Sequence, residues 1–405
     1  MLLQKPAFLL FYHARAAEAS FGEWLGVLWH GLSLDCTVAG YVTAFPVLVV
    51  LASFWIPLSQ RVWRIVLTVY FSLIALVTAA IFAVDLNLYG YWGFRLDGSV
   101  LIYLSDPGEA LASASWGEVL RQILIMLVYA GAMIWSYRWI LRLFRVEPVP
   151  LRGRIVPTVA ALLIGGLTFL AIRGGVTVAT ANVSKVYFSS NMFLNHAATN
   201  PVFSFLSSVG DNENYAEAYP FFEEERRKTL FEELRGNRPG ADAGTPRLLR
   251  SDRPNVVLIL LESFGRTIMD ETVNGEPVMP NMQRFKREGV WFENFFANSF
   301  RTDRGQVAVL CGFPAQTTMS IMKLPRKSAT LPSLARSLGR EGYRSVFMYG
   351  GDLNFTNQAS FMYSTGWEEL IWQKDMQLDA PTSKWGYADD VVVDLFGDEV
   401  EAVSY

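Results

Sequence analysis

The chain has 405 residues, of which 51% are hydrophobic and 14% are aromatic, and its formal net charge is −3. This length predicts two or three domains, while the near-neutral charge and the lack of a nucleic-acid-binding motif exclude a typical nucleic-acid-binding protein. Two cysteines, Cys36 and Cys311, are too few for a disulfide framework.

The N-terminal half contains four long apolar segments, at residues 37–57, 65–85, 119–140 and 155–172. Each segment can cross the hydrocarbon core of a bilayer, which needs about 20 residues. A large buried helical core is the other interpretation, but so many nearly uncharged runs favour membrane spans. An apolar patch at residues 7–12 is interrupted by His13 and Arg15, so it is too short for a span and lacks the layout of a signal peptide.

Arginines are concentrated in two of the connections between these spans. They are Arg61 and Arg64 after the first span, and Arg142, Arg145, Arg152 and Arg154 after the third. The intervening loop at residues 86–118 carries only Arg95 beside several carboxylates. By the positive-inside rule, the arginine-bearing connections are cytoplasmic, so we expect the chain beyond Arg173 to lie outside the membrane.

A linker is expected between the spans and a soluble domain. The polar stretch at residues 181–211 should lie along the outer membrane face. The pattern of residues 219–234 predicts an amphipathic helix. It could lie on the membrane surface, but its many glutamates favour a linker helix that packs on the soluble domain. The glycine, proline and arginine content of residues 236–254 is typical of a linker. The predicted domains are a transmembrane helical domain (1–180), an extracytoplasmic linker (181–253) and an α/β domain (254–405).

The pattern beyond residue 254 alternates between strand and helix. We expect strands at residues 256–261, 290–296 and 345–349, and helices at residues 281–288, 331–341, 358–364 and 388–396. A further helix should begin near Thr302. This alternation predicts a parallel sheet covered by helices, and Gly342 is expected to end the helix that precedes it.

Two segments of this domain carry the candidate chemistry. Residues 256–264 (VVLILLESF) are typical of a strand buried on both faces, with Glu262 at its C-terminal end. Residues 299–305 (SFRTDRG) place Thr302 just before an apolar stretch that can open a helix. Because ligands of open α/β sheets lie beyond the C-terminal ends of the strands, we expect Glu262 and Thr302 to meet at one rim. A hard cation held by the carboxylate could also bind and activate the Thr302 hydroxyl, which makes Thr302 a candidate nucleophile.

Four further residues are candidates for binding substrate. Arg301 and Arg304 flank Thr302, and guanidinium groups match the oxygens of a phosphate, although pairing with Asp303 explains them equally well. Asp352 and Asn357 lie in a polar segment that follows the expected strand at residues 345–349.

The segments NVVLILLESF, MPNMQRFKREGVWFENFFANS and SFRTDRG, in this order, resemble the alkaline phosphatase/sulfatase superfamily. Within it, the chain is most similar to the lipoteichoic-acid-synthase-like membrane transferases. The resemblance implies a sulfatase-like α/β domain with Glu262 as a metal ligand and Thr302 as nucleophile and ligand. It also implies that the segment with Asp352 and Asn357 contacts the substrate. Cys311 lacks the setting of a sulfatase nucleophile, so we expect a small core residue there.

The chain also departs from this family. The family completes its metal site with a later Asp-His pair, whereas all three histidines here, His13, His30 and His196, precede the α/β domain. We therefore expect an incomplete fold, as in a truncated or split member. Thr356 and Gln358 stand where lipoteichoic acid synthases have Trp and Arg, which puts the glycerol-phosphate substrate in question.

The resemblance implies a multi-pass transferase of the bacterial cytoplasmic membrane, with an extracytoplasmic catalytic domain. It would move a phosphoglycerol-type headgroup from a phospholipid to a glycan or glycolipid acceptor through phospho-Thr302. Phosphoethanolamine transfer and a non-catalytic membrane protein that keeps half the fold are the alternatives. The oxygen ligands favour manganese or magnesium over zinc. With Glu262 and Thr302 alone, the 405 residues are expected to bind manganese weakly and not to hydrolyse a phosphatidylglycerol analogue.

Overall fold

The computed structural model of the chain describes residues 1–103, 115–145, 150–209, 220–235, 249, 251–316 and 319–403. The chain forms two compact units, and each is considered by itself. The first unit comprises Met1–Asn212 and Asp303–Tyr405, and the second comprises Glu213–Thr302.

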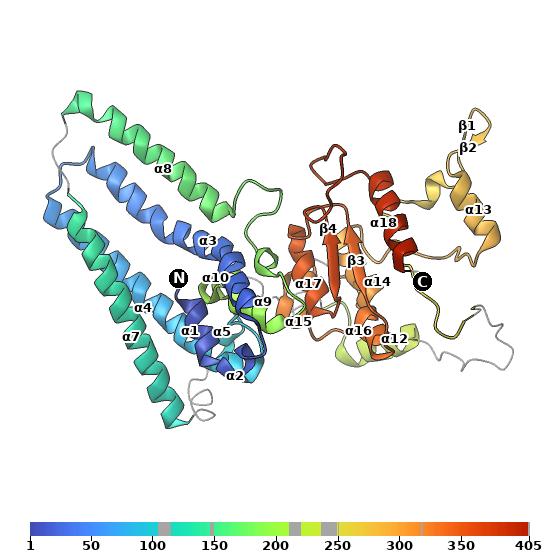
Figure 1. Cartoon of the computed structure of the whole chain (residues 1–405), viewed down its shortest axis with the longest axis horizontal. Helices are drawn as coiled ribbons and strands as arrows, with labels where there is room; N and C mark the ends of the chain where they lie inside the picture. The colour runs from blue at the N-terminus through green and yellow to red at the C-terminus, as the bar shows by residue number, and fades with distance from the viewer. Residues whose placement is uncertain are drawn as a thin grey trace. The chain divides into compact units, whose positions relative to one another are not determined.

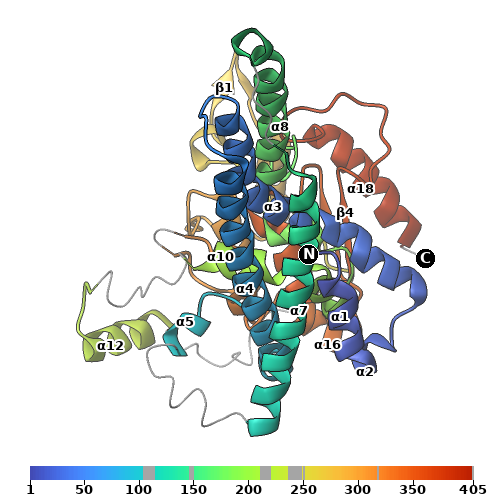
Figure 2. The same cartoon turned by 90° about the vertical axis from the view of Figure 1, so that its left-hand side faces the viewer.

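Four helices of the first unit are long and apolar enough to cross a membrane, as the sequence predicts. They are α3 (Phe21–Ser53), α4 (Gln60–Trp92), α7 (Trp116–Leu143) and α8 (Ile155–Arg173). Helix α3 packs on α8, and α4 packs on α7 along its length (Figure 1, Figure 2). The N-termini of α3 and α7 are longer than expected because each begins at a Ser-x-x-Glu capping box, at Ser20 and Ser115 respectively.

The short apolar patch near the N-terminus lies in helix α1 (Gln4–Phe11), which is followed by α2 (His13–Ala16). Its Phe8 and Leu9 are buried in a core shared with α3, α4, α9 (Met192–Ala198) and α10 (Pro201–Ser208). The stretch at residues 181–211, expected to lie along the outer membrane face, contributes buried side chains of short helices to this core, and its residues 210 and 211 lie outside the described part.

Buried ion pairs fix α1 and the end of α4 in this core. Lys5 Nζ lies 2.6 Å from Asp35 Oδ1, which also accepts a hydrogen bond from Asn200 Nδ2 at 2.7 Å. Arg95 Nη2 lies 3.0 Å from Asp85 Oδ2. Because a buried charge without its partner is costly, removing one member of either pair would destabilise the segments that the pair joins.

The C-terminal part of the first unit contains a small parallel sheet with helices around it. Strands β3 (Val346–Tyr349) and β4 (Glu369–Trp372) pair in parallel, with Val346 opposite Glu369. The helices are α14 (Thr302–Cys311, with Thr302 from the second unit), α15 (Pro325–Ser328), α16 (Leu334–Arg340), α17 (Gln358–Ser364) and α18 (Asp389–Val403). Gly342 ends α16 with a φ of 80°, as predicted, whereas β4 has no counterpart in the sequence prediction.

This part of the chain has its own hydrophobic core, in which Leu310, Met322 and Phe361 are buried. Cys311 lies in the same core, and burial raises the pKa of its thiol to about 11. A buried thiol of this kind is a poor nucleophile, which agrees with the expectation that Cys311 is a core residue.

The C-terminal part packs against the membrane helices within the first unit. Asn182 Nδ2 donates to the Asn354 carbonyl at 2.8 Å, just before the short helix η2 (Val183–Val186). At a second contact, Arg326 Nη1 on α15 donates to Ser99 Oγ at 2.6 Å. The guanidinium of Arg326 also lies over the Trp92 ring, 4.2 Å from its centroid.

The second unit contains α12 (Glu224–Arg235), η3 (Arg266–Ile268), β1 (Thr272–Val273), β2 (Glu276–Pro277) and α13 (Pro280–Glu288). Helix α13 confirms the prediction at residues 281–288, and α12 confirms most of the amphipathic helix, whose first expected residue lies outside the described part. The expected strands at residues 256–261 and 290–296 are not formed, and their side chains are exposed.

These two strand predictions are wrong for a physical reason. A strand takes its hydrogen bonds from neighbouring strands, and an apolar run alone does not provide them. Among the described residues of the second unit, the pairing of strands is limited to the short antiparallel β1 and β2.

Candidate functional site

Glu262 and Thr302 meet in the second unit. Thr302 Oγ1 donates a hydrogen bond to Glu262 Oε2 at 2.8 Å, although the two residues are 40 positions apart. Both side chains are exposed. The expected proximity is therefore present even though residues 256–261 do not form a paired strand. Their roles as ligand and nucleophile stay predictions.

The local backbone explains how each side chain is presented. Ser263, directly after Glu262, has a φ of 62°, a left-handed conformation that is uncommon for a residue other than glycine. It turns the chain, and the Gly265 amide donates to the Ser263 carbonyl at 3.0 Å. Thr302 is the first residue of α14. The first amides of a helix lack intrahelical acceptors and favour negative charge, so this position suits an oxyanion or a phosphate.

The two candidate arginines differ in their surroundings. Arg301 precedes α14 and is exposed, and its amide donates to Ser299 Oγ at 3.4 Å. Arg304 lies within α14 and is buried, as is Asp303, whose carbonyl accepts a hydrogen bond from Ser320 Oγ at 2.8 Å. Arg301 is thus presented to solvent beside Thr302, whereas Arg304 belongs to the packed face of the helix.

Asp352 and Asn357 lie in the first unit, in the loop between β3 and α17. Asp352 Oδ1 accepts hydrogen bonds from the amide and the side-chain nitrogen of Asn354, both at 2.9 Å. Thr356 and Asn357 have φ values of 54° and 66°. A β-branched residue in this region is strained, and strain of this kind is concentrated at functional sites.

Asn357 has a further unusual feature. Its side chain is buried, and its Nδ2 donates a long hydrogen bond of 3.4 Å to the Lys323 carbonyl. Its Oδ1 has no hydrogen-bond donor among the described residues. A buried acceptor without a protein donor can accept a hydrogen bond from a water molecule or a ligand.

Sequence reasoning missed the residues that support this loop. Asn182 and Ser184 bind it from the segment after α8, since Ser184 Oγ accepts from the Ser360 amide at 3.0 Å. Lys185 lies close to Asp352; burial lowers the pKa of Lys185, and the Asp352 charge opposes that shift. The polar segment Asn182–Lys185 directly after a span was the available signal for these residues. Nothing in the sequence indicated that it contacts the loop with Asp352 and Asn357.

The donor types at Glu262 and Thr302 fit a divalent cation, because carboxylate and hydroxyl oxygens suit hard ions such as Mn²⁺ and Mg²⁺. These two residues supply only part of a coordination sphere. Across the described ranges, no three His, Cys, Asp or Glu side chains are grouped closely enough to hold a metal.

Residues 254–403 match the family model described as Sulfatase. Over 165 residues the chain is 34% identical to phosphoglycerol transferase I of Xanthomonas campestris pv. campestris, covering 38% of this chain and 23% of that protein. It is 31% identical over 130 residues to lipoteichoic acid synthase 1 of Bacillus subtilis, covering 29% of this chain and 19% of the relative.

A solved protein of the alkaline phosphatase superfamily from Vibrio parahaemolyticus is 29% identical over 32% of each chain, with a TM-score of 0.30. The chain thus spans less than a quarter of the length of the curated relatives that it matches. The described part of the chain thus has four helices long and apolar enough to cross a membrane, and residues 254–403 match the Sulfatase family model. The chain is similar over part of its length to enzymes named phosphoglycerol transferase I and lipoteichoic acid synthase 1.

Proposed function

We propose that this protein transfers a phosphoglycerol-type headgroup from a membrane phospholipid to a glycan or glycolipid, through a covalent intermediate on Thr302. The observation that carries this proposal is the 2.8 Å hydrogen bond from Thr302 Oγ1 to Glu262 Oε2 at the start of α14. The names of the relatives support the headgroup, since they include phosphoglycerol transferase I.

In the first step, Thr302 Oγ attacks the phosphorus of the phospholipid phosphodiester. The hydroxyl proton passes toward the Glu262 carboxylate, which already accepts its hydrogen bond. The bond between phosphorus and the diacylglycerol oxygen breaks, and diacylglycerol leaves after its oxygen takes up the proton that Glu262 received, so Glu262 is ionised again. The N-terminal amides of α14 and the guanidinium of Arg301 stabilise the phosphate charge during the transfer.

In the second step, a hydroxyl of the acceptor attacks the same phosphorus and releases Thr302. Glu262 accepts the hydroxyl proton and returns one to the Thr302 oxygen, so the side chains regain their initial state. Phosphoryl transfer of this kind depends mainly on positioning and charge neutralisation. A divalent cation held in part by Glu262 and Thr302 would supply further neutralisation when bound, with manganese or magnesium suited to oxygen ligands.

The membrane part supports a lipid donor and an extracytoplasmic reaction. The arginines of the two connections favour their retention in the cytoplasm, which supports an extracytoplasmic location of residues beyond α8 at a bacterial cytoplasmic membrane. Asp352 and Asn357 are the candidate substrate-binding residues of the first unit, and their loop is bonded to the segment directly after α8. A headgroup at the outer membrane surface is therefore within reach of this loop.

Kinetics of hydroxyl variants test the proposal in the protein isolated from its own membranes. With labelled phosphatidylglycerol in vesicles, Thr302→Ala should lower headgroup transfer by at least about 1,000-fold, because it removes the nucleophile. Thr302→Ser should retain measurable transfer, and Glu262→Gln should lower it. Thr330→Ala is the matched control, since Thr330 is also an exposed threonine, with only a local bond to the Lys327 carbonyl. Undiminished transfer by Thr302→Ala would rule out the covalent mechanism.

A further inference from the structure

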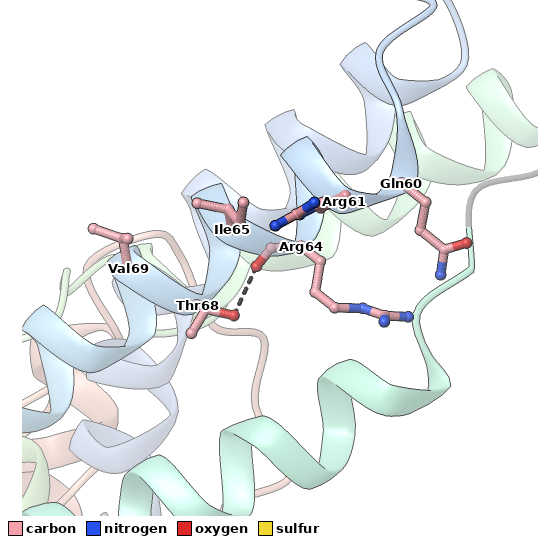
Figure 3. Close-up of a pocket in the computed structure, with 6 residues that line it drawn as sticks. All are labelled: Gln60, Arg61, Arg64, Ile65, Thr68 and Val69. Atoms are coloured by element: carbon pink, nitrogen blue, oxygen red, sulfur yellow. Dashed lines mark hydrogen bonds between the residues drawn. The ribbon is translucent and has the colours of Figure 1, made fainter.

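We propose that the N-terminal end of α4 binds the phosphate of an anionic phospholipid between Arg61 and Arg64, with an acyl chain along Ile65 and Val69. The site is a cavity of about 490 Å³ (Figure 3). Its lining residues are Gln60, Arg61, Arg64, Ile65, Thr68 and Val69. This inference is separate from the proposed transfer reaction, because it concerns a different part of the chain.

The lining residues form two adjacent rows with helical spacing. Gln60, Arg64 and Thr68 follow one another at intervals of four, and so do Arg61, Ile65 and Val69. Residues four apart lie on the same face of a helix. Both arginines belong to the first turns of α4, and the exposed Ile65 and Val69 follow further along the span. The cavity is therefore charged at the end nearer the membrane surface and apolar toward the middle of the span.

This order matches the order of groups in a phospholipid. A headgroup phosphate lies at the membrane surface, and the acyl chains extend from it into the hydrocarbon core. Ile65 and Val69 are 52% and 54% exposed, so apolar surface is available beside the cations. Free phosphate would use the arginines but leave this surface unused, which favours a lipid over an inorganic anion.

The charges around the cavity favour an anion. The sequence has no Asp or Glu from Cys36 through Val84, so α4 offers no acidic partner to Arg61 or Arg64 near its start. Ser59, the residue before α4, makes no side-chain hydrogen bond to the helix. The first amides of a helix attract anions when no side chain caps them.

Contacts with the end of α7 hold the polar row in place. The Phe144 carbonyl accepts hydrogen bonds from Gln60 Nε2 at 3.0 Å and from Arg64 Nη2 at 3.3 Å. Arg64 is thereby fixed at one side of the cavity, and its guanidinium extends from α4 toward the chain that follows α7 (Figure 3). A pre-positioned guanidinium loses less side-chain entropy when it binds a phosphate.

Aromatic side chains indicate the depth of the cavity in the membrane. Trp55 lies five residues before α4 and is exposed, and its Nε1 donates to Thr158 Oγ1 at 3.1 Å. Trp139, in the last turns of α7, is also exposed. Tryptophan is enriched at the level of the lipid headgroups, so both residues assign the cavity to that level.

Native mass spectrometry of the full chain in detergent, titrated with phosphatidylglycerol or phosphatidylcholine, tests the site. The wild type should retain phosphatidylglycerol in preference to phosphatidylcholine. The double variant Arg61→Gln/Arg64→Gln should weaken phosphatidylglycerol binding by about tenfold or more, because it removes charge-assisted hydrogen bonds to the phosphate. Arg61→Lys/Arg64→Lys should weaken it less, since both charges remain. Circular dichroism checks that each variant keeps its helix content.

Arg138→Gln is the matched control, because Arg138 is an exposed arginine of α7 outside the cavity lining. It should leave phosphatidylglycerol binding unchanged. An equal loss of phosphatidylglycerol binding in Arg138→Gln would overturn the proposal. It would mean that binding depends on the total positive charge where α4 begins and α7 ends, and not on the two arginines of the cavity. Equal retention of phosphatidylcholine would overturn it too. Inorganic phosphate is the last arm: displacement of the lipid by millimolar phosphate would show a simple anion site and contradict the lipid assignment.

Discussion

Asn182 donates a hydrogen bond from Nδ2 to the carbonyl of Asn354 at 2.8 Å, across 172 positions of sequence. Two residues later, Ser184 Oγ accepts a hydrogen bond from the Ser360 amide. One bond is made to the loop that contains Asp352 and Asn357, and the other to α17 directly after it. The segment that follows the last membrane helix therefore acts as a support for a candidate substrate-binding loop.

Hydrogen exchange at Ser360 should report this support directly. Ser184→Ala removes the acceptor of the Ser360 amide, and a lost hydrogen bond of about 1 kcal/mol corresponds to roughly fivefold faster exchange where opening is local. Mass-spectrometric exchange of the full chain measures it on peptides that cover residues 355–365. Ser207→Ala is the control, since the Ser207 hydroxyl bonds only within its own helix segment. Unchanged exchange in Ser184→Ala would refute the support.

Stability should decrease below pH 6.5 because of His196. Burial, followed by the charges of Arg95 and Arg15, lowers the pKa of His196 from 6.5 to about 3. Between these values the unfolded chain binds a proton that the folded chain does not, so acid favours unfolding in this range. At pH 5 the cost approaches about 2 kcal/mol relative to pH 7.5.

Thermal unfolding in detergent at these two pH values measures the effect. His196→Gln keeps a polar group near Tyr89, whose hydroxyl lies 3.1 Å from His196 Nδ1, but removes the titration. The drop in melting temperature between pH 7.5 and 5 should be smaller in this variant than in the wild type. An identical drop in both proteins would show that His196 does not cause the loss of stability between pH 7.5 and pH 5.

The sequence predicted elements that form through local interactions, and it failed where an element depends on pairing between residues far apart in the chain. The membrane helices, α13 and α17 were predictable because helical hydrogen bonds and capping are local. Residues 256–264 have the composition of a buried strand, but strand formation depends on neighbours that composition does not specify. Strand β4 was missed for the same reason, since Glu369–Trp372 is short and becomes a strand only by pairing with β3.

The candidate site shows a similar division. Glu262 and Thr302 were identified from sequence motifs, and their predicted proximity is present as a hydrogen bond between the two side chains. The buried Asn357 Oδ1 and the left-handed Thr356 could not be foreseen, because both depend on how the loop packs. The supporting Asn182 and Ser184 lie far from this loop in sequence, and only the folded chain connects them.

Manganese should bind the 405-residue chain weakly. Glu262 and Thr302 offer one carboxylate and one hydroxyl, so water would fill most coordination positions of the ion, and we expect a Kd above about 100 µM. Isothermal titration calorimetry of the wild type and Glu262→Ala measures it, with Asp270→Ala as an exposed carboxylate control. Micromolar binding that disappears in Glu262→Ala would contradict this expectation and mean that another residue completes the site.

Cysteine accessibility should place residue 251 outside the cell. In a Cys36→Ala background, Ser251→Cys should react with an impermeant maleimide on intact cells, whereas Ser59→Cys, beside Arg61, should react only after permeabilisation. Cys311 should not interfere, because its thiol is buried and its pKa is raised to about 11. Labelling of Ser59→Cys but not Ser251→Cys on intact cells would reverse the orientation.

A search for the covalent intermediate tests the central claim most directly. The protein isolated from its own membranes would be mixed with phosphatidylglycerol, quenched in acid within the first turnover, and digested for mass spectrometry. The account predicts that the peptide with Thr302 gains a glycerophosphoryl group, and that Thr302→Ala abolishes both this adduct and transfer. Transfer that proceeds at an undiminished rate with no adduct on Thr302, or with the adduct on another residue, would contradict it.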